Sequence, residues 1–332
     1  MRYIEAVRAQ GRNLRACRAG IAGRFSRADL APWRDEALAL AGMGASYNAV
    51  LAAVGSYWET GIRASAWLGS ELQRQGADRN FGAVIAVTQS GRSAEVVSCL
   101  ASLPARYPKL VLTDDPRSPA AEGADLTVPL SLLEDSAVRT LGYTGTVAAL
   151  ALVRDMLTGA AGRPDWERVA DEVERQVPEA ERFAERVLPS IRSIRSFDVV
   201  GSGAHLGSAA QGALLLREVS RLAGAPYDSR QYLHGPVEVA EPGTAVIVIG
   251  GSREAQLAVS LADAGAAVIL ITSENVGERK GLFVFGLPRA DDHALPVLEI
   301  LPLQTVALAL AEDNGVPVDD FRHHQDDTKV GG

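Results

Sequence analysis

The sequence places a cluster of hydrogen-bonding side chains directly after an apolar run. The run AVIAV, residues 83–87, is followed by Thr88, Gln89, Ser90, Gly91 and Ser93, and then by a helix-like segment. Where a strand ends and a helix begins, free backbone N–H groups and the positive end of the helix dipole favour an anion. The stretch therefore predicts a cradle for a phosphate or a similar anion. A simple helix N-cap at Ser90 or Gly91 explains the same residues.

A second group of residues with possible chemistry is the pair Glu218 and His234. Glu218 lies in a helix-like segment among the apolar neighbours Leu214, Leu215, Val219 and Leu222. A carboxylate in apolar surroundings can have a pKa near neutrality and serve as a general base. Alternatively, Glu218 forms an ion pair with Arg217 or Arg221. His234 precedes Gly-Pro in a turn-rich segment, where functional side chains are often presented, although an isolated histidine is more often structural.

Two glycine turns also follow apolar runs. They read GMGAS at 42–46 and GSGAH at 201–205. Neither matches the dinucleotide fingerprint, because the third glycine is missing or misplaced and no clear acidic strand end follows the first turn. We therefore expect no nucleotide cofactor, and the similarity of the two turns indicates an internal pseudo-repeat.

These motifs are set in a pattern of short apolar runs that alternate with helical segments. Such a pattern predicts parallel sheets with helices on both faces. The strand-like runs are 37–41, 83–87, 110–112, 126–128, 197–200, 245–249, 267–271 and 298–301. The helix-like segments are 46–61, 92–103, 137–158, 205–223, 253–264 and 303–314.

Four parts of the chain are predicted from this pattern. Residues 1–30 form an N-terminal helical segment, 31–160 a first α/β domain, 161–190 a helical connector, and 191–332 a second α/β domain with a C-terminal tail. The N-terminus is rich in arginine, so a transit peptide is an alternative. Its apolar residues have helical spacing, which favours a helix packed on the body of the protein.

Composition limits the partners and the compartment. The formal net charge of −8 argues against a general nucleic-acid or membrane surface, and we found no apolar run of the roughly 18 residues that a membrane span needs. Cys17 and Cys99 have no metal or redox spacing, which fits a reducing compartment and predicts a cytoplasmic protein. The tail cluster around His323 and His324 lacks a recognised ligand frame, so we expect no metal.

Four of these motifs, in order and spacing, resemble tandem proteins of the SIS (sugar isomerase) domain family. TQSGRS is similar to the family's SxSGxT phosphate loop. GMGASY, LREVSR with LHGP, and LPLQTVALALAEDNGVPVDDFR resemble segments of the isomerase half of glucosamine-6-phosphate synthase. The resemblance covers residues 35–322. It implies two SIS domains, each a mostly parallel five-stranded sheet flanked by helices in a flavodoxin-like sandwich.

The resemblance also implies roles for individual residues. Phosphate-binding positions of the family fall on Thr88, Gln89, Ser90 and Ser93, and a substrate-contacting serine on Ser46. Glu218 matches the carboxylate that moves a proton between C1 and C2 of the sugar. His234 matches a ring-opening histidine that reaches in from a partner subunit, which implies a homodimer. No cofactor is implied.

The chain departs from the synthase at several of its functional positions. Leu215 and Asp326 stand where the synthase has lysines, and His323 or Lys329 of the tail could contribute instead. The usual STK segment is replaced by Arg139-Thr140-Leu141. Arg139 could grip an acid group of the substrate, or it could pair with Glu134 or Asp135.

The predicted function is therefore an aldose–ketose isomerase or a deaminating isomerase of a phosphorylated sugar or amino sugar, such as a hexosamine 6-phosphate. A deglycase of a fructosamine phosphate belongs to the same group of enzymes. Two alternatives stay open at this point. One is a non-catalytic SIS protein that binds and senses sugar phosphates, and the other is an isomerase of a sulfonated or carboxylated sugar, as Arg139 suggests.

Overall fold

The structure is a computed structural model that describes residues 1–332 except 23–28, 75–79, 160–164, 292, 324–326 and 332. The chain forms two compact units, each built on one sheet. The β1–β5 unit contains Arg12–Glu134, Leu141–Ala170 and Arg322–Gly332, and the β6–β10 unit contains Met1–Gly11, Asp135–Thr140 and Asp171–Phe321. The C-terminal tail therefore belongs to the unit that carries the first sheet.

The β1–β5 unit contains a parallel sheet with the strand order β2-β1-β3-β4-β5. Its strands are β1 (Leu38–Gly42), β2 (Ala64–Leu68), β3 (Ala83–Val87), β4 (Lys109–Thr113) and β5 (Leu126–Pro129). Its helices are α2 (Ala31–Arg34), α3 (Ala45–Glu59), α4 (Gly69–Arg74), α5 (Ala94–Ser102), α6 (Pro119–Glu122) and α7 (Leu141–Thr158). All residues of the central strands β1 and β3 are buried, as expected for apolar runs covered on both faces.

The β6–β10 unit repeats this topology in the order β10-β9-β8-β6-β7, again fully parallel. The strands are β6 (Ser196–Gly201), β7 (Ala223–Asp228), β8 (Ala245–Ile249), β9 (Ala267–Thr272) and β10 (Leu282–Gly286). The helices are α9 (Ala204–Glu218), α10 (Ser229–Tyr232), α11 (Ser252–Asp263) and α12 (Leu295–Asp313), with a 3₁₀ turn at Pro236–Val239. Read from the first strand of each sheet, both orders are 2-1-3-4-5, the flavodoxin-like order.

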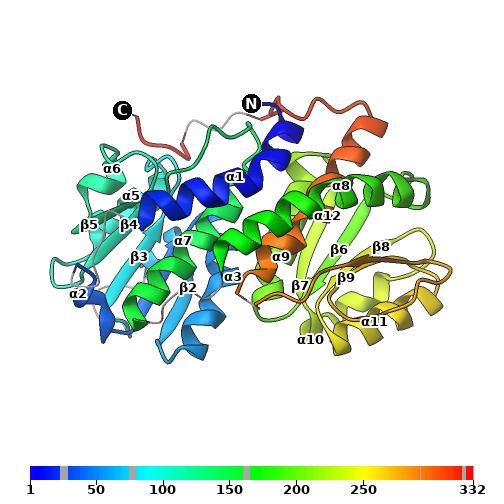
Figure 1. Cartoon of the computed structure of the whole chain (residues 1–332), viewed down its shortest axis with the longest axis horizontal. Coiled ribbons are helices and arrows are strands. Elements are labelled where there is room, and N and C mark those ends of the chain that lie inside the picture. The colour runs from blue at the N-terminus through cyan, green and yellow to red at the C-terminus, as the bar shows by residue number, and fades with distance from the viewer. Residues whose placement is uncertain (23–28, 75–79, 160–164, 292, 324–326, 332) are drawn as a thin grey trace. The chain divides into compact units, whose positions relative to one another are not determined.

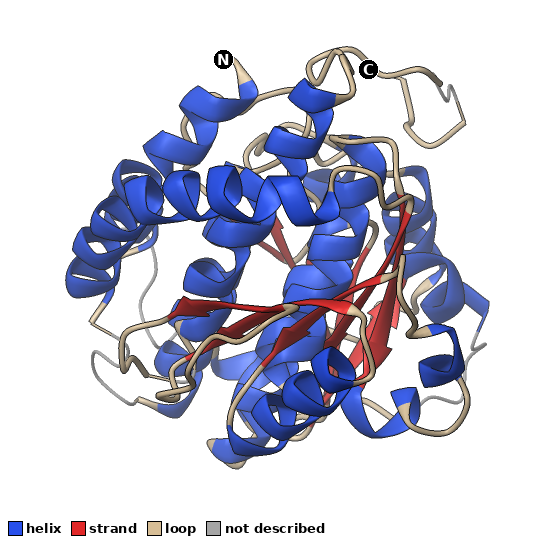
Figure 2. Cartoon of the chain, turned by 90° about the vertical axis from the view of Figure 1, so that its right-hand side faces the viewer, coloured by secondary structure: helices blue, strands red, loops and turns tan. Residues whose placement is uncertain are grey.

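The pseudo-repeat indicated by the two glycine turns is present in the backbone. Gly44, before α3, has φ 52° and ψ −129°, and Gly203, before α9, has φ 59° and ψ −128°. This left-handed conformation is one that glycine adopts without steric cost. Figures 1 and 2 show the strands of both units lying between layers of helices.

The N-terminal segment and the connector are helical, as predicted. Helix α1 (Tyr3–Ile21) buries Tyr3, Val7, Leu14 and Cys17 on one face. Helix α8 (Trp166–Ile191) is strongly amphipathic, with a buried face that includes Val173. The first residues of α1 and most of α8 belong to the β6–β10 unit, and the remainder of each helix belongs to the β1–β5 unit.

Several sequence-based assignments were wrong. Residues 298–301 lie inside α12 and do not form a strand, because a short apolar run cannot be distinguished from a buried helical segment by periodicity. Strands β2, β7 and β10 were missed. β2 and β7 contain few β-branched residues, and β7 includes Gly224 and Pro226. The helix predicted to run to residue 223 ends at Glu218, and Arg221 has φ 55°.

Helix α12 also departs from the expectation based on apolar run lengths. By length and composition it is apolar enough to cross a membrane, but 83% of its apolar stretch is buried inside the structure. A core helix of a soluble fold has the same property, so the helix is weak evidence for a membrane span.

Candidate active site

The 88–93 loop connects β3 to α5 at the carboxyl end of the first sheet. The Thr88 hydroxyl is buried and donates to Ser93 Oγ over 3.2 Å, and Ser90 Oγ accepts from the Arg92 N–H over 3.3 Å. Gly91 has φ 67°, and a Cβ there would lie 1.8 Å from Ser118 Oγ. The loop therefore requires glycine at this position and holds its hydroxyl groups close to one another.

The loop is not explained by an N-cap at Ser90 or Gly91. Helix α5 begins at Ala94, so Ser93 is the N-cap residue, and its side chain makes no capping hydrogen bond. Because the Ser93 hydroxyl is not used to cap the helix, it is available to the loop. Strand β3 pairs with β1, where the strand order reverses, and Ser46 lies in the first turn of the helix that follows β1. Ligands of doubly wound sheets bind at this switch point.

The C-terminal tail pairs with the same loop. Ser93 and Lys329 form an isolated antiparallel bridge. The Ala94 N–H donates to the Thr328 carbonyl oxygen over 3.1 Å, and the Val330 N–H donates to the Arg92 carbonyl oxygen over 2.9 Å. Of the two tail residues proposed from sequence, the structure thus brings Lys329 to the loop.

The other tail positions do not show such a contact. His323 is exposed and makes no described contact with the loop, while His324 and Asp326 lie outside the described residues. Within the described part of the chain, no group of three or more His, Cys, Asp or Glu side chains is arranged to hold a metal ion.

Glu218 is the last residue of α9 and is mostly buried. Burial raises the pKa of its carboxyl group from 4.5 to about 7. The ion pairs proposed as an alternative do not form. Arg217 Nε donates to the Gly224 carbonyl oxygen over 2.8 Å, and Arg221 Nη2 donates to the Asp320 carbonyl oxygen over 2.8 Å. Among the described residues, Glu218 has neither a hydrogen bond nor an ion pair, so its carboxylate is stabilised by no cation.

Tyr3 is a neighbour of Glu218 that the sequence did not reveal. It is buried, and its pKa is raised first by burial and then by the negative charges of Glu218 and Asp135. Its hydroxyl group is 3.5 Å from the Gln304 carbonyl oxygen. Only the fold brings residue 3 next to residue 218, because no spacing in the sequence relates them.

Arg139 and Thr140 lie in the segment Asp135–Thr140 of the β6–β10 unit. Asp135 Oδ1 accepts from the Thr140 hydroxyl over 2.8 Å and from the Thr140 N–H over 3.2 Å, so this hydroxyl stabilises the segment. Arg139 is exposed, and its Nη1 donates to the Ser136 carbonyl oxygen over 3.4 Å. Glu134, Asp135 and Arg139 are all described residues, and no ion pair joins Arg139 to either carboxylate.

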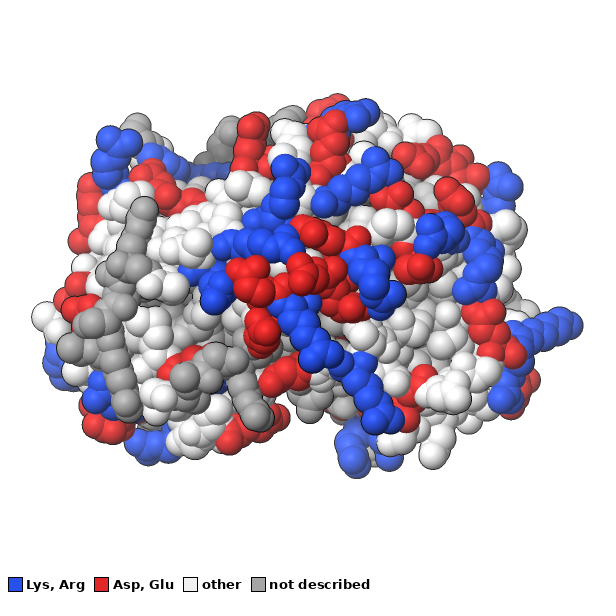
Figure 3. Space-filling model, viewed as in Figure 1, with Lys and Arg blue, Asp and Glu red and all other residues white. Residues whose placement is uncertain are grey.

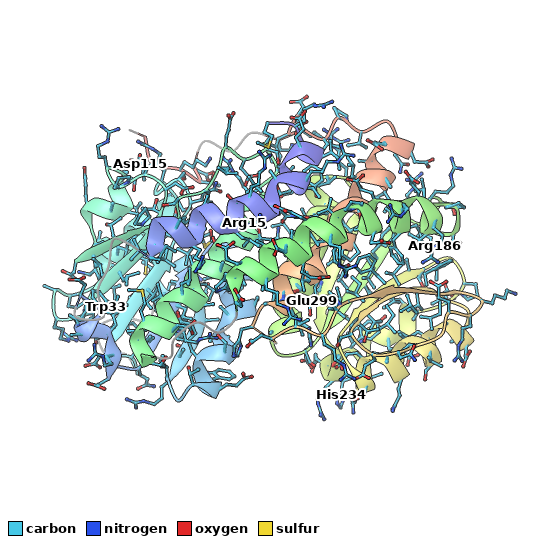
Figure 4. All side chains as sticks on the ribbon, in the orientation of Figure 1. Arg15, Trp33, Asp115, Arg186, His234 and Glu299 are labelled. Atoms are coloured by element: carbon cyan, nitrogen blue, oxygen red, sulfur yellow. The ribbon has the colours of Figure 1, made fainter. Side chains whose placement is uncertain are left out.

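His234 lies in an exposed turn after α10, at the edge of the view in Figure 4. Its N–H donates to the Gln231 carbonyl oxygen over 3.0 Å. The neighbouring apolar side chains Leu233 and Val239 are 45% and 57% exposed. The turn therefore presents an imidazole together with apolar surface.

The predicted site residues thus fall into two groups. The β1–β5 unit holds the first group, which consists of Ser46, Thr88, Gln89, Ser90, Ser93 and Lys329, and within it Ser93 contacts both Thr88 and Lys329. The β6–β10 unit holds the second group, which consists of Arg139, Thr140, Glu218 and His234. Within that second group, burial raises the pKa of Glu218 to about 7.

The β6–β10 unit also contains two polar clusters that sequence reasoning missed. In one, the buried Glu299 binds His205 Nδ1 at 2.6 Å and the Ser208 hydroxyl at 2.5 Å. The other joins the buried Glu254 to the hydroxyl groups of Ser202 and Ser229. Glu299 could have been noticed in the sequence as an acidic residue inside the apolar run 298–301. That run was predicted to be a strand, so the residue was not considered.

The fold and the loop together define a class of protein: an α/β chain with two flavodoxin-like sheets, one of which carries a polar loop at its switch point. Sequence comparison gives one match to a family model. Residues 190–311, which include the β6–β10 sheet, match the SIS domain model. This finding confirms the resemblance drawn from the motifs.

Named relatives fit the same assignment. The chain is 26% identical over 251 residues to the isomerizing glutamine–fructose-6-phosphate aminotransferase of Shouchella clausii, an alignment that covers 71% of this chain and 42% of the relative. The chain thus spans less than half the length of that enzyme.

Two solved structures share the fold. Tagatose-6-phosphate ketose/aldose isomerase from Escherichia coli has a TM-score of 0.81 at 20% identity, with 96% of this chain and 95% of the other covered. Glucosamine-6-phosphate deaminase from Thermotoga maritima has a TM-score of 0.78 at 20% identity, with 97% and 98% covered.

Proposed function

We propose that the protein is an isomerase of a phosphorylated sugar or amino sugar, with or without loss of ammonia. The observation that carries this proposal is Glu218, a buried carboxylate without a cation whose pKa is raised to about 7. A group with this pKa exists in both protonation states at neutral pH, which suits a base that removes a proton from one carbon and returns it to the next. A carboxylate that served only stability would be paired.

The 88–93 loop supports the choice of a phosphorylated substrate. Its hydroxyl groups, the N-terminus of α5 and the Gly91 turn form a set of donors that suits an anion. The relatives named above act on sugar phosphates according to their names. In this proposal the loop binds the phosphate, Lys329 adds a positive charge beside it, and Ser46 contacts the substrate. No cofactor is needed for such a proton transfer.

The roles of the remaining residues follow from the chemistry. In the isomerisation step, Glu218 takes a proton from the carbon next to the carbonyl group, and a second group moves the proton between the two oxygens. The resulting enediol then takes the proton back at the other carbon. We assign ring opening to His234, whose imidazole can exchange a proton near neutral pH. Arg139, being exposed, is assigned to a further polar group of the substrate.

The test is a kinetic comparison of the wild type with Glu218→Gln on fructose 6-phosphate and glucosamine 6-phosphate, measuring both ketose–aldose conversion and ammonia. We expect the variant to fold, to bind substrate, and to lose roughly 10²–10⁴ in kcat, the usual contribution of general acid–base catalysis. Exchange of solvent deuterium into C1 or C2 should disappear with it. Glu312→Gln, which changes an exposed glutamate, is the matched control and should leave kcat unchanged.

Two outcomes would contradict the proposal. A well-folded Glu218→Gln variant with a near-wild-type rate would remove the assigned base. A wild type that binds sugar phosphates tightly but converts none of them would favour a sensing protein.

We also propose a cytoplasmic homodimer in which His234 completes the site of the partner subunit. The exposed Leu233 and Val239 beside His234 support such an interface, and Cys17 and Cys99 are buried and form no disulfide. Mixing equal amounts of the inactive variants Glu218→Gln and His234→Ala should restore about a quarter of the wild-type activity, because random pairing gives one intact site in every mixed dimer. A monomer in sedimentation at micromolar concentration would exclude this assembly.

A further inference from the structure

A groove of the β6–β10 unit lies between α8 and the edge strand β10. Its volume is about 670 Å³, within the range of ligand-binding pockets. Three arginines of α8 line one wall, Arg175, Arg182 and Arg186, and the aromatic rings of Phe183 and Phe285 meet edge to face at 5.3 Å in the floor. Neither the phosphate loop nor Glu218 lines this groove.

The groove is lined by three arginines and one acidic residue, Glu179, in a chain whose net charge is −8. Figure 3 shows no broad basic surface on the face it displays, where the two signs are interspersed. Arg182 and Arg186 form ion pairs with Glu179 and Glu278 at 2.7 and 2.8 Å, and Arg175 pairs with Glu172. The pairs of Arg182 with Glu179 and of Arg186 with Glu278 are exposed and therefore weak, so a ligand carboxylate can replace the glutamate in each of them.

Gln176 provides an independent sign of a missing partner. The residue lines the groove and is 4% exposed. Its Nε2 donates to Glu172 Oε1 over 3.2 Å, which fixes the amide so that Oε1 faces away from Glu172. Oε1 is buried and has no hydrogen-bond partner among the described residues. A buried acceptor without a donor is costly, and this one belongs to a residue that lines the groove.

Strand β10 supplies further backbone groups. It is the last strand of its sheet and pairs only with β9. The Val268 N–H donates to the Gly281 carbonyl oxygen and the Leu287 N–H to that of Thr272, so odd-numbered residues of β10 face β9 and even-numbered residues face the open edge.

The beginning of this open edge is already covered. The Val284 N–H donates to Glu278 Oε1 over 2.8 Å, and Arg186 holds that carboxylate (Figure 4 labels Arg186). Because even-numbered residues of β10 face away from β9, the Val284 carbonyl oxygen and the Gly286 N–H point to the open edge. Both residues line the groove. An acceptor and a donor two residues apart are what a strand needs to add to a parallel sheet.

We propose that this groove binds an extended peptide segment that carries acidic residues on either side of an apolar one. Its backbone would pair with Val284 and Gly286 and donate to Gln176, its apolar side chain would cover Phe183 and Phe285, and its carboxylates would bind the arginines. The lengths agree. From Arg175 to Arg186 the helix rises about 16 Å, which is also the span of about five extended residues.

The test uses the full chain and a fluorescein-labelled peptide, acetyl-Asp-Val-Phe-Val-Asp-amide, in a fluorescence anisotropy titration. We expect saturable binding that Arg175→Glu with Arg182→Glu weakens by roughly tenfold or more, since charge-assisted contacts are lost. Arg168→Glu, an exposed arginine of the same helix outside the groove, should bind like the wild type. Methylating the central amide nitrogen of the peptide should weaken binding by a similar factor.

Each alternative result overturns a stated part of the proposal. If the peptide does not bind, or if binding is unaffected by the double arginine variant, the groove is not its site. If inorganic phosphate competes as well as the peptide does, the groove is an anion site only. If the N-methylated peptide binds equally well, the edge of β10 does not take part. None of these outcomes depends on the isomerase activity.

Discussion

The two sheets have the same topology, but the hydroxyl groups at their carboxyl ends donate hydrogen bonds to different acceptors. In the β1–β5 unit, Thr88 donates to Ser93, and both belong to the loop itself. In the β6–β10 unit, the hydroxyl groups of Ser202 and Ser229 donate to Glu254 Oε1 over 3.0 and 2.7 Å. Glu254 lies in the first turn of α11, the helix that follows β8. The 88–93 loop has the corresponding position in the other unit, between β3 and α5.

Under the proposed function, this difference gives the repeated fold one ligand site and not two. The buried carboxylate of Glu254 acts as an internal anion that already occupies the hydroxyl donors at the second switch point. An external phosphate there would meet a negative charge at short range. Function therefore depends on the side chains placed at the switch point and not on the topology that both units share.

The largest effect should come from removing the hydroxyl groups at each switch point in turn. Ser90→Ala with Ser93→Ala should weaken sugar-phosphate binding by about 3–6 kcal/mol, because two hydrogen bonds to a charged group are lost. The matched pair Ser202→Ala and Ser229→Ala should leave KM unchanged. Substrate titration by calorimetry would check both double variants. Equal losses of binding free energy in the two would contradict the contrast between the two switch points.

A second prediction compares the mostly buried carboxylate of Glu218 with the buried one of Glu254. Burial raises the pKa of Glu218 to about 7 from its ordinary 4.5, so the folded state holds this proton at pH values where the unfolded state has released it. The free energy of unfolding should therefore decrease as pH rises from about 4.5 to 7, by about 3 kcal/mol.

The Glu218→Gln variant should lack this decrease and should be more stable than the wild type at pH 8. Urea titrations at pH 4 and pH 8 measure the difference. If the free energy of unfolding changes with pH in the same way in both proteins, the Glu218 carboxyl group is solvated. It then does not differ in environment from an ordinary glutamate, as this comparison with Glu254 requires.

The smallest effect concerns stability. Ser229→Ala removes a donor from a buried carboxylate and should lower the free energy of unfolding by about 1–3 kcal/mol. Ser90→Ala should lower it by less than about 1 kcal/mol, since Ser90 is only half-buried and accepts from a single backbone N–H. Chemical denaturation of both variants would show whether the serines of the second sheet are structural and those of the loop are not.

The sequence by itself determined the central strands and located the candidate site residues along the chain. Runs such as 83–87 and 245–249 are apolar throughout because they are buried on both faces. Their residue types alone therefore predict buried strands. The 88–93 loop could be located because its hydroxyl donors directly follow such a run, at the end of a strand where a helix begins. Local composition carried less information at the sheet edges, so β2, β7 and β10 were missed.

Only the tertiary structure decided which side chains meet. Glu218 has a raised pKa because the fold buries it and sends Arg217 and Arg221 to backbone carbonyl groups, an outcome that depends on how α9 ends. The backbone pairing of Lys329 with Ser93 joins residues from distant parts of the chain. The hydrogen bond between Ser202 and Glu254 does the same. Contacts of this kind depend on distances in space, which residue types and spacing in a single sequence do not encode.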